Sequence, residues 1–579
     1  MNALLLLLIA AVVLVLGYIF YGGWLSKQWG LDDSNITPAH TMEDGVDYVP
    51  AKPYVVIGHH FSSIAGAGPI NGPIQAAIFG WVPVLLWVLI GGIFFGAMHD
   101  FGALFASLRH KGQTLAAVVA ANIDESAKKL FCVFSFLTLV LVVAAFASIV
   151  AGTFADPDGT NIANARTATI SVLFIIVAVI WGVVTRGKNV PAPAMILGAI
   201  AAIIVIVAVG YNFPILSGIS NTTWMVIIGL YILVASVAPV WILLQPRDYL
   251  SSYLLYGMII LAVVAIIGAS IFGNTSFEGT IPAFTAFDTT GLFTDAKVFG
   301  GRGLLFPALF VTIACGAISG FHSLVSSGTT SKQLDKESEA RPIAYGGMLL
   351  ECLLAVISLC AVAYVWGAVV DGTFTTPTQV FAGGLSAMLG VIPGLEGVGG
   401  EAGSIAYSLL ILAVSAFCLT SLDTATRIGR MMFQELFTKQ GEEVHEIEGV
   451  RKFLVNPYVA TVITVILGVA LGMTGYAIIW PLFGAANQLL AALALLAVCS
   501  FLGNIGRNNK MFYIPMAFML VVTLTSLFIT GKAKLTALMT GGIAFAPAIQ
   551  FVLAVVLFVL AIVLAVKGAK QIFGSKKEA

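Results

Sequence analysis

Apolar stretches long enough to cross a bilayer recur along the whole of this chain. We count about fifteen between residues 3 and 567, each close to the roughly 20 residues that a helix needs to span the hydrocarbon core. The 579 residues are 59% hydrophobic and only 10% charged, whereas soluble domains carry about 25% charged residues. The polar connections are too short to bury cores of their own. The sequence therefore predicts an all-α polytopic membrane protein, with residues 1–579 forming a single integral membrane domain.

The basic residues indicate how the chain is oriented. If every stretch crosses, most of the 28 Lys and Arg fall on one side, and that side is cytoplasmic by the positive-inside rule. This predicts the N-terminus outside and the C-terminus inside. The first stretch lacks a basic segment before it and a clear cleavage site, so we expect a mature helix rather than a signal peptide. A net charge of zero gives no basic field for nucleic acid, and no such partner is expected.

The six cysteines all lie inside apolar stretches and show no C-x-x-C spacing. This pattern indicates neither a disulfide framework nor a zinc site. We expect these residues to pack in the interior, and we expect no metal and no cofactor.

The stretch GHHFSSIAGAGPINGP, residues 58–73, interrupts the second apolar segment with four glycines, two prolines and two histidines. Glycine and proline leave backbone groups that lipid cannot solvate, so a break at this depth should line a cavity. Amides at the start of a half-helix suit an anion such as a carboxylate. Glycines for close helix packing, or a kinked helix, are the alternatives. The predicted substrate-binding residues here are His59, His60, Ser63, Gly66, Gly68 and Gly72.

A second polar interruption is CGAISGFHSLVSSGTTSKQ, residues 315–333. Its hydroxyls and freed carbonyls are hard oxygen ligands for a small cation or a substrate. The alternative is that the hydroxyls bond back to their own helix. We assign Ser319 and His322 to substrate binding. We assign Ser326, Ser327, Thr329 and Thr330 to coupling or gating.

Two further segments place charges near the ends of apolar stretches. In APVWILLQPRDY, Pro239 is expected within a helix that ends at Pro246, which makes Arg247 and Asp248 either a wetted cytoplasmic helix end or a gate ion pair. In LTSLDTATRIGR, Asp423 and Arg427 are four residues apart on one helix face and can pair. That pair is either structural or part of an inner gate.

Three other ionisable residues fall at membrane depth, where such groups are costly and usually functional. His99 and Asp100 lie near the inner end of the third stretch, and Glu351 lies within the tenth. Because histidine titrates near neutral pH, we assign His99 and Asp100 to coupling or gating. A hydrogen-bonded packing role for each histidine is the alternative.

Many transporters consist of two inverted five-helix repeats with broken helices at the interface. The predicted sidedness permits such a repeat in a core that spans residues 55–244 and 250–430. The two repeat halves within this core are 55–211 and 222–430. Residues 1–54 would then form a peripheral helix and loop, and 456–579 accessory helices. By analogy, the core would be leucine-transporter-like, with the second, seventh and ninth stretches as core helices one, six and eight.

The sequence also resembles a known family in long blocks that occur in order between about residues 54 and 500. These blocks include GHHFSSIAGAGPINGP, GAMHDFGALFASLR, PVWILLQPRDYLSSYLL, FPALFVTIACGAISGFHSLVSSGTTSKQL, LTSLDTATRIGR and WPLFGAANQLLAALAL. They are similar to the signature blocks of the carbon starvation protein A family. The resemblance implies a secondary transporter of the prokaryotic cytoplasmic (inner) membrane, associated with proton-coupled pyruvate uptake and with peptide uptake during carbon limitation.

We therefore hypothesise a symporter that imports a small carboxylate, pyruvate, driven by a proton gradient, with sodium as the alternative ion. The alternative functions are a short-peptide transporter and a nutrient sensor that works with a membrane kinase. No Walker A sequence is present, which disfavours ATP-driven transport by this chain. We find no nucleophile, base and oxyanion constellation, so an enzyme is not expected and no catalytic residue is assigned. Membrane lipid is an expected partner, and the oligomeric state is left open.

Overall fold

The structure is a computed structural model, and it describes residues 1–45, 47–185, 188, 191–239, 241–400, 404–439, 442, 447–541 and 545–574. Over these residues the chain is helical, and its only β-type pairings are three isolated bridges. All six cysteines are free and buried, as predicted. The expected all-helical fold is confirmed.

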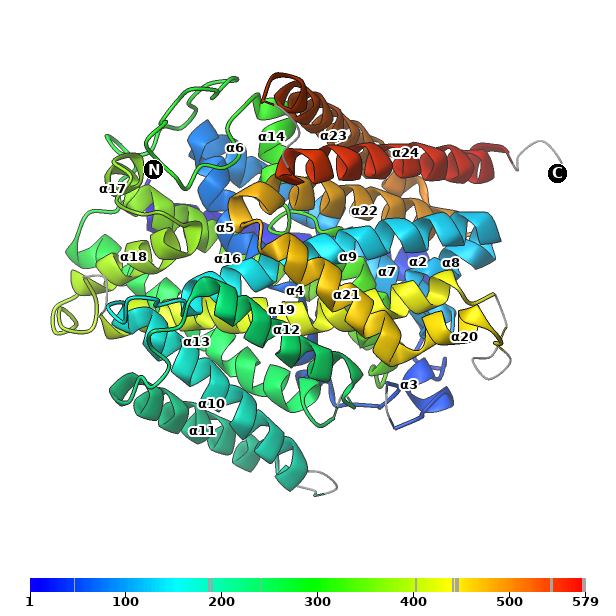
Figure 1. The fold of residues 1–579 in the computed structure, drawn as a ribbon, viewed down its shortest axis with the longest axis horizontal. Coiled ribbons are helices and arrows are strands. Elements are labelled where there is room, and N and C mark those ends of the chain that lie inside the picture. The colour runs from blue at the N-terminus through cyan, green and yellow to red at the C-terminus, as the bar shows by residue number, and fades with distance from the viewer. Residues whose placement is uncertain are drawn as a thin grey trace.

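The first half of the chain runs from α1 to α13 (Figure 1). Its helices are α1 (Ala3–Leu16), α2 (Gly23–Trp29), α3 (Pro38–Thr41), α4 (Pro53–Ile64), α5 (Gly68–Ala76), α6 (Trp81–Leu86), α7 (Ala97–Arg109), α8 (Leu115–Asn122), α9 (Glu125–Phe154), α10 (Ile162–Thr185), α11 (Ala192–Asn212), α12 (Asn221–Val237) and α13 (Leu244–Phe272). The π-helical segments η1 (Gly17–Gly22) and η3 (Trp87–Gly96) join α1 to α2 and α6 to α7 into long rods.

The second half begins after a long connection. Its helices are α14 (Leu305–Thr312), α15 (Gly320–Gly328), α16 (Gly346–Tyr364), α17 (Trp366–Val370), α18 (Pro377–Gly390), α19 (Ile405–Leu436), α20 (Val450–Val455), α21 (Pro457–Gly472), α22 (Tyr476–Asn504), α23 (Tyr513–Gly541) and α24 (Phe545–Gly574). The short helices η4 (Thr330–Lys332) and η6 (Arg341–Tyr345) follow α15 and precede α16.

Each of the predicted apolar stretches corresponds to a helical segment. Within the described residues, eleven helices are long and apolar enough to cross a membrane. Two more, α12 and α21, are shorter apolar helices, and the remaining two stretches are the broken pairs α4–α5 and α14–α15. The chain is therefore a multi-pass membrane protein.

The predicted interruption of the second stretch is confirmed. Helix α4 ends at Ile64 and α5 begins at Gly68, which leaves 65–67 outside any helix. Pro69 lies in the first turn of α5, where a missing backbone N–H has no cost. All residues from Gly58 to Pro73 are buried, so the break lies inside the protein rather than against lipid.

The predicted course around residues 238–248 is wrong. Helix α12 ends at Val237, before Pro239, and α13 begins at Leu244. Pro246 is therefore in the first turn of a new helix, a position that tolerates proline. Arg247 and Asp248 are 1% and 0% exposed, so they do not form a wetted helix end.

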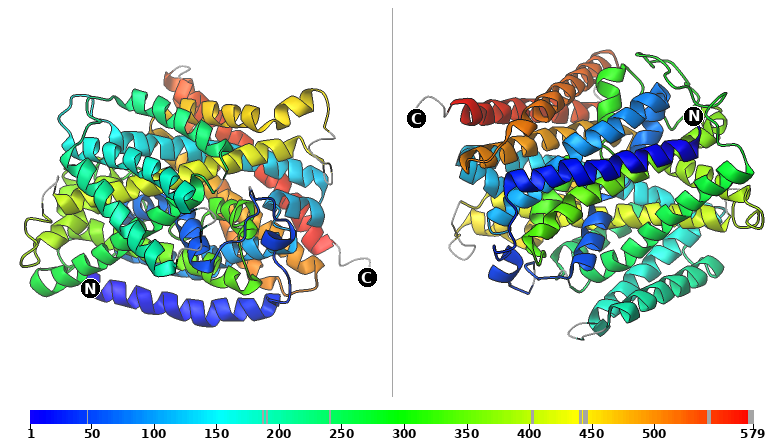
Figure 2. Two further views of the ribbon diagram at one scale, coloured as in Figure 1. Left: turned by 90° about the horizontal axis from the view of Figure 1, so that it is seen from below. Right: turned by 180° about the vertical axis from the view of Figure 1, so that it is seen from behind.

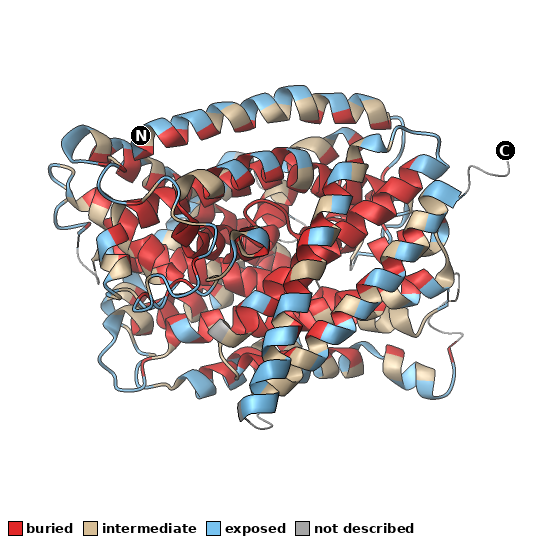
Figure 3. Cartoon of the chain, turned by 90° about the horizontal axis from the view of Figure 1, so that it is seen from above, coloured by how far each residue is buried: buried red, intermediate tan, exposed pale blue. Residues whose placement is uncertain are grey.

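The core has a regular packing pattern. Helices α9, α12, α19 and α21 all pack against one another, α4 lies along α13, and α15 lies along α22. The hairpins α10–α11 and α23–α24 occupy opposite edges of the bundle (Figure 1), and α1 lies along its periphery (Figure 2). Figure 3 shows buried residues concentrated in the centre, with the outward side of α1 exposed along its length. This arrangement encloses both helix breaks.

Candidate functional site

The first break is lined by α9 and α19. A Cβ added to Gly66 would lie 2.8 Å from the Phe146 ring and 3.1 Å from Ser421 Oγ. Ser421 Oγ donates to the Ser63 carbonyl at 3.0 Å, and Thr424 Oγ1 donates to Ser63 Oγ at 3.3 Å. Hydroxyl groups of α19 thus provide hydrogen-bond partners at the C-terminal end of α4, where the backbone hydrogen bonds of that helix stop.

The two breaks touch each other. A Cβ on Gly68 would lie 2.3 Å from Cys315 Cβ and 2.4 Å from Cys315 Sγ, and one on Gly72 would lie 3.0 Å from the Ile313 Cα. Both neighbours belong to 313–319, the unwound segment between α14 and α15. These glycines are therefore required for the close approach of the two broken helices, which was the packing alternative for this motif.

Amide side chains of α22 hold the second break. Asn487 Nδ2 donates to the Ala314 carbonyl and to Ser319 Oγ, both at 3.0 Å, and Phe321 N donates to Asn487 Oδ1 at 2.8 Å. Gln488 Nε2 donates to the Ile313 carbonyl at 2.9 Å. Freed backbone groups at this break are thus satisfied by a neighbouring helix, and Ser319 serves this clamp.

A buried ionic cluster joins α4, α12, α13 and α19. We call the group Tyr231, Arg247, Asp248, Asp423 and His59 the arginine cluster. Arg247 Nη2 donates to Asp248 Oδ1 at 2.6 Å, Arg247 Nη1 forms an ion pair with Asp423, and His59 Nδ1 lies 2.7 Å from Asp248 Oδ2. Tyr231 OH lies 2.9 Å from Arg247 Nη1 and donates to Asp423 Oδ2 at 2.5 Å. One guanidinium therefore contacts two carboxylates from different helices.

The predicted pairing of Asp423 with Arg427 is wrong. Arg427 instead pairs with Asp47 at 3.1 Å and donates to the Ala238 carbonyl. The two residues share a helix face by spacing, but Asp423 is closer to the guanidinium of α13. Arg427 joins the inner end of α19 to the loop before α4.

That loop closes the bundle at the inner end of α15. Val49 N donates to the Lys332 carbonyl at 3.2 Å and Ala51 N to the Gln333 carbonyl at 3.0 Å. Lys332 Nζ lies 5.1 Å from the centre of the Tyr48 ring. Burial, followed by the nearby acidic groups Asp44, Asp47 and Glu435, raises the pKa of Tyr48 to about 12. The tyrosine is thus a neutral part of this closure at physiological pH.

A second ionisable cluster joins α7, α15 and α16. We call the group His99, Asp100, His322 and Glu351 the histidine cluster. Asp100 accepts from His99 Nδ1 at 2.7 Å and from His322 Nδ1 at 2.8 Å. His322 Nε2 lies 3.2 Å from Glu351 Oε2. All four side chains are 0% exposed, so the structure brings His99 and Asp100 together with His322, as a connected chain.

The hydroxyls of the second motif have mixed roles. Thr330 Oγ1 lies 2.8 Å from His60 Nδ1 and so links η4 to α4. Ser327 and Thr329 donate to carbonyls four residues earlier in their own segment, at 2.7 and 3.0 Å, which is the alternative stated above. Ser326 is buried, and its Oγ makes no hydrogen bond in the part of the chain that the structure describes.

Cavities near the site differ in character. A polar cavity of about 340 Å³ lies between α5, α9, α18, α19 and the start of α22, and its lining includes Asn71, Thr378, Gln379 and Tyr476. Gln75 Nε2 donates to Tyr476 OH at 2.7 Å, which narrows the space between this cavity and the breaks. We call it the outer vestibule, since its lining lies at the predicted outer ends of α9, α19 and α22.

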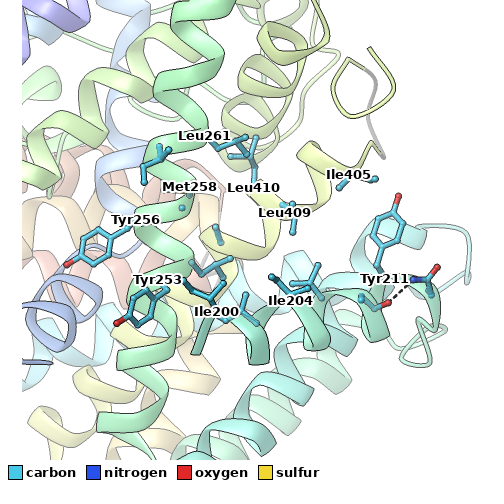
Figure 4. A pocket seen from close by; sticks show the side chains of 18 residues that line it. Ile200, Ile204, Tyr211, Tyr253, Tyr256, Met258, Leu261, Ile405, Leu409 and Leu410 are labelled. Atoms are coloured by element: carbon cyan, nitrogen blue, oxygen red, sulfur yellow. Dashed lines mark hydrogen bonds between the residues drawn. The ribbon is translucent and has the colours of Figure 1, made fainter. Parts of the chain in front are cut away.

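Another cavity, of about 730 Å³, is a different kind of space. It lies between α11, α13 and α19 and is lined mainly by aliphatic side chains with Tyr211, Tyr253 and Tyr256 (Figure 4). Its place beside the peripheral α10–α11 hairpin and its apolar lining fit lipid chains better than a charged substrate. It contains none of the predicted site residues.

Among the described residues, one group has the spacing that a metal site would require. The donor atoms of Cys315, His322 and Glu351 all lie within 4.8 Å of one another. We do not assign them as metal ligands, because Cys315 Sγ has its own contacts in the clamp, with Ser319 Oγ at 3.6 Å and with Asn487 Nδ2 at 3.7 Å. The expectation of no metal and no cofactor stays a prediction.

Several residues of these clusters were not in the predicted site. Glu351 was recognised for its depth but not assigned, and Tyr231, Asp47 and Asn487 were not considered. Asn487 lies in the conspicuous block WPLFGAANQLLAALAL, which marks the segment but does not indicate the partners of its amide. The others take their role from partners that are remote in sequence.

Comparison with known proteins finds relatives that are all named transporters. The sequence profile described as "Carbon starvation protein CstA" matches residues 2–371 and 368–526. The peptide transporter CstA of Campylobacter jejuni is 32% identical over 90% of this chain and 79% of its own, and that of Escherichia coli is 33% identical over 91% and 80%. The pyruvate/proton symporter BtsT of Escherichia coli is 29% identical over 90% and 81%.

Solved structures resemble the chain more distantly. A manganese transporter of Eremococcus coleocola covers 92% of this chain and 99% of its own, with 13% identity and a TM-score of 0.48. MhsT in complex with L-phenylalanine covers 90% and 99%, with 13% identity and a TM-score of 0.43. At TM-scores below 0.5 these likenesses carry no conclusion about substrate.

Proposed function

This chain belongs to the carbon starvation protein CstA family, and from that premise we propose that it is a secondary active transporter that imports pyruvate together with protons. Its named relatives are transporters, so the chain is a transporter and not an enzyme. One relative is named a pyruvate/proton symporter. The direction, substrate and ion are our proposal.

The observation that carries this proposal is the meeting of two broken helices inside the buried core. Helix α5 begins at Gly68 without a side-chain cap, so the positive end of its dipole is available to a carboxylate. Ser421 and Thr424 of α19 reach the same break, and the outer vestibule lies above it. We infer that the substrate carboxylate binds between α5 and α19, where rocking of one group of helices against another would alternate its access.

The packing favours an inverted repeat in a different register from the predicted halves 55–211 and 222–430. The broken pair α4–α5 matches α14–α15, and both are followed by a long helix, α6–α7 or η6–α16. Next, α9 packs on α19 and α12 on α21, while α13 lies along α4 as α22 lies along α15. We propose repeats over 53–272 and 305–504, with α10–α11 and α18 inserted in them, which makes the ninth stretch core helix six.

The remaining assignments follow from the number of stretches and the charge bias. We propose that the N-terminus is outside and the C-terminus inside, in the inner membrane of a prokaryote. Helix α24 ends on the opposite side of the bundle from the start of α1 (Figure 1), as an odd number of crossings requires.

Uptake into proteoliposomes tests the function. Purified protein is reconstituted and given labelled pyruvate under an inward proton gradient, an inward sodium gradient, or neither. We expect accumulation above the equilibrium ratio only with the proton gradient. Uptake that no gradient stimulates would refute symport. Accumulation driven by the sodium gradient would identify sodium as the coupling ion in place of the proton.

A short-peptide substrate is the second candidate, because two specific observations favour it. Relatives in three or more genera are named peptide transporters, and the outer vestibule of about 340 Å³ is lined by polar amides and hydroxyls. The same vesicles supplied with labelled dipeptides decide between the two. Saturable dipeptide uptake that pyruvate does not inhibit would favour the peptide function.

A further inference from the structure

We propose that Glu351, paired with His322, binds the proton that the transporter carries in its cycle. This inference deepens the proposed function and rests on it, since coupling has meaning only in a symporter. The binding of a proton at this pair can be tested without any substrate.

The hydrogen bonds of His322 carry the argument. Asp100 is a carboxylate and accepts from His322 Nδ1 at 2.8 Å, so a neutral His322 ring has its lone pair on Nε2. That atom lies 3.2 Å from Glu351 Oε2. With Asp100 ionised, an ionised Glu351 and the lone pair on Nε2 would repel at this distance, so the arrangement favours one extra proton on the pair, on either residue.

Charge balance leads to the same conclusion. Asp100 and Glu351 are both 0% exposed, and in the described part of the chain their ion partners are histidines alone. With neutral histidines and no extra proton, the site would contain two uncompensated buried charges, which costs several kcal/mol each. Neither oxygen of Glu351 accepts a hydrogen bond from another described residue, so the carboxyl is free to gain or lose the proton.

The titratable groups around Glu351 come from every helix that surrounds it. They are His322 of α15, Asp100 and His99 of α7, Cys315 of the unwound segment, Cys352 of α16 and His60 of α4. His60 lies against Gly347, one turn before Glu351, where a Cβ would be 3.2 Å from the ring. Its Nε2 has no hydrogen-bond partner among described residues, and its Nδ1 lies 2.8 Å from Thr330 Oγ1.

The position of His322 explains how a proton could act on the transport site. His322 is the third residue of α15, directly after the unwound segment, and α15 packs against α4, which ends at the first break. A change of charge on this pair is therefore felt at both helix breaks. Protonation would favour one arrangement of the broken helices, and deprotonation the other.

The first test separates exchange from accumulation. Glu351→Gln keeps the size and neutral charge of a protonated glutamate. In proteoliposomes we expect pyruvate counterflow to stay within about threefold of wild type, because exchange needs no net proton movement, while proton-driven accumulation is lost. Cys360→Ser, a buried position farther along α16, and Glu435→Gln, a carboxylate bonded to Thr114, should retain both. Wild-type accumulation by Glu351→Gln would overturn the proposal.

The second test needs no substrate. Infrared difference spectra of the purified protein between acid and alkaline pH should contain a protonated-carboxyl band that Glu351→Gln removes. His322→Gln keeps the carboxyl but removes its partner, and should move the pH at which the band disappears. An unchanged band in both variants would overturn the proposal, as would a stoichiometric metal ion that Glu351→Gln releases. If wild type moves neither pyruvate nor dipeptides, the proposed function fails, and the infrared result still decides the fate of Glu351.

Discussion

Arg247 supplies the guanidinium of the arginine cluster, and it contacts carboxylates from two helices. Asp248 follows it directly in α13, whereas Asp423 approaches from α19. Removing a shared partner from a buried pair strands the remaining charges, which costs about 3–5 kcal/mol. We therefore expect the arginine cluster to contribute to the stability of the folded protein as well as to any gating.

We expect Arg247→Met to lower the free energy of unfolding by about 3–5 kcal/mol, because Asp248 and Asp423 lose their cation. Lys567→Met is the matched control, since Lys567 pairs with Asp124 while both are partly exposed, and such pairs contribute about 1 kcal/mol or less. Thermal unfolding midpoints of the detergent-solubilised proteins give the comparison. Equal midpoints for the two variants would show that the arginine cluster is not a stabilising unit.

At the scale of single residues, the sequence identified which residues are unusual but not which ones meet. The depth of His99, Asp100 and Glu351 followed from hydropathy, because position within an apolar stretch is a local property. The spacing of Asp423 and Arg427 suggested a pair that the fold does not form. Their actual partners, Arg247 and Asp47, are remote in the sequence, the latter by 380 residues, and one sequence contains no information about such contacts.

At the scale of helices, the contact between the two broken pairs is the main constraint. The space that a side chain on Gly68 would need is filled by Cys315. Glycine and proline predicted the first break, since their effect on a helix is local, whereas the second was predicted from the polar residues of 315–333 and lies at 313–319. The clamp by Asn487 and Gln488 could not be predicted, because amides on an apolar helix give no indication of their target.

We expect Gly68→Ala to reduce transport about tenfold or more, because overpacking at this contact costs about 1–3 kcal/mol. Gly257→Ala in α13 is the control, since nothing lies within 4 Å of a Cβ there. Adding Cys315→Gly to Gly68→Ala should restore part of the initial uptake rate in vesicles. Full activity of Gly68→Ala alone would contradict the close contact.

Asn487→Leu should destabilise the second break. It leaves the Ala314 carbonyl, Phe321 N–H and Ser319 hydroxyl without their partner, at about 1–3 kcal/mol for each buried group. Hydrogen exchange measured by mass spectrometry should increase over peptides that contain 313–322 and stay unchanged in α9. Protection equal to wild type would mean that the clamp does not hold this segment.

At the scale of the whole molecule, the two ends of the central region differ. The outer vestibule is a polar cavity, whereas the loop 47–52 is hydrogen-bonded across the inner end of α15. In the orientation that we propose, the cavity lies at the outer end and the hydrogen-bonded loop at the inner end, as in an outward-facing transporter. The number and positions of the stretches were predictable from hydropathy, while the register of the repeats depended on which helices pack together.

We expect Asp47→Asn to open the inner side, since it removes the carboxylate that pairs with Arg427. Ser326→Cys serves as reporter, because Ser326 is buried and the six native cysteines are buried too. Labelling by a thiol reagent from the inner side should be several-fold faster when Asp47→Asn is added, as expected for loss of a charge-assisted bond. The exposed Glu43→Gln is the control, and equal rates in the two backgrounds would contradict an inner gate at this pair.

The missing side chain at Gly68 also has a mechanical consequence. Because Cys315 occupies the space where a side chain on Gly68 would lie, neither broken helix can slide or tilt without displacing the other. The two helices must therefore move together. Two helices in such close contact adopt a few discrete arrangements and not a continuous range of them. A leak, with the path open to both compartments at once, would require the two helices to disengage, and their interlock makes that state rare.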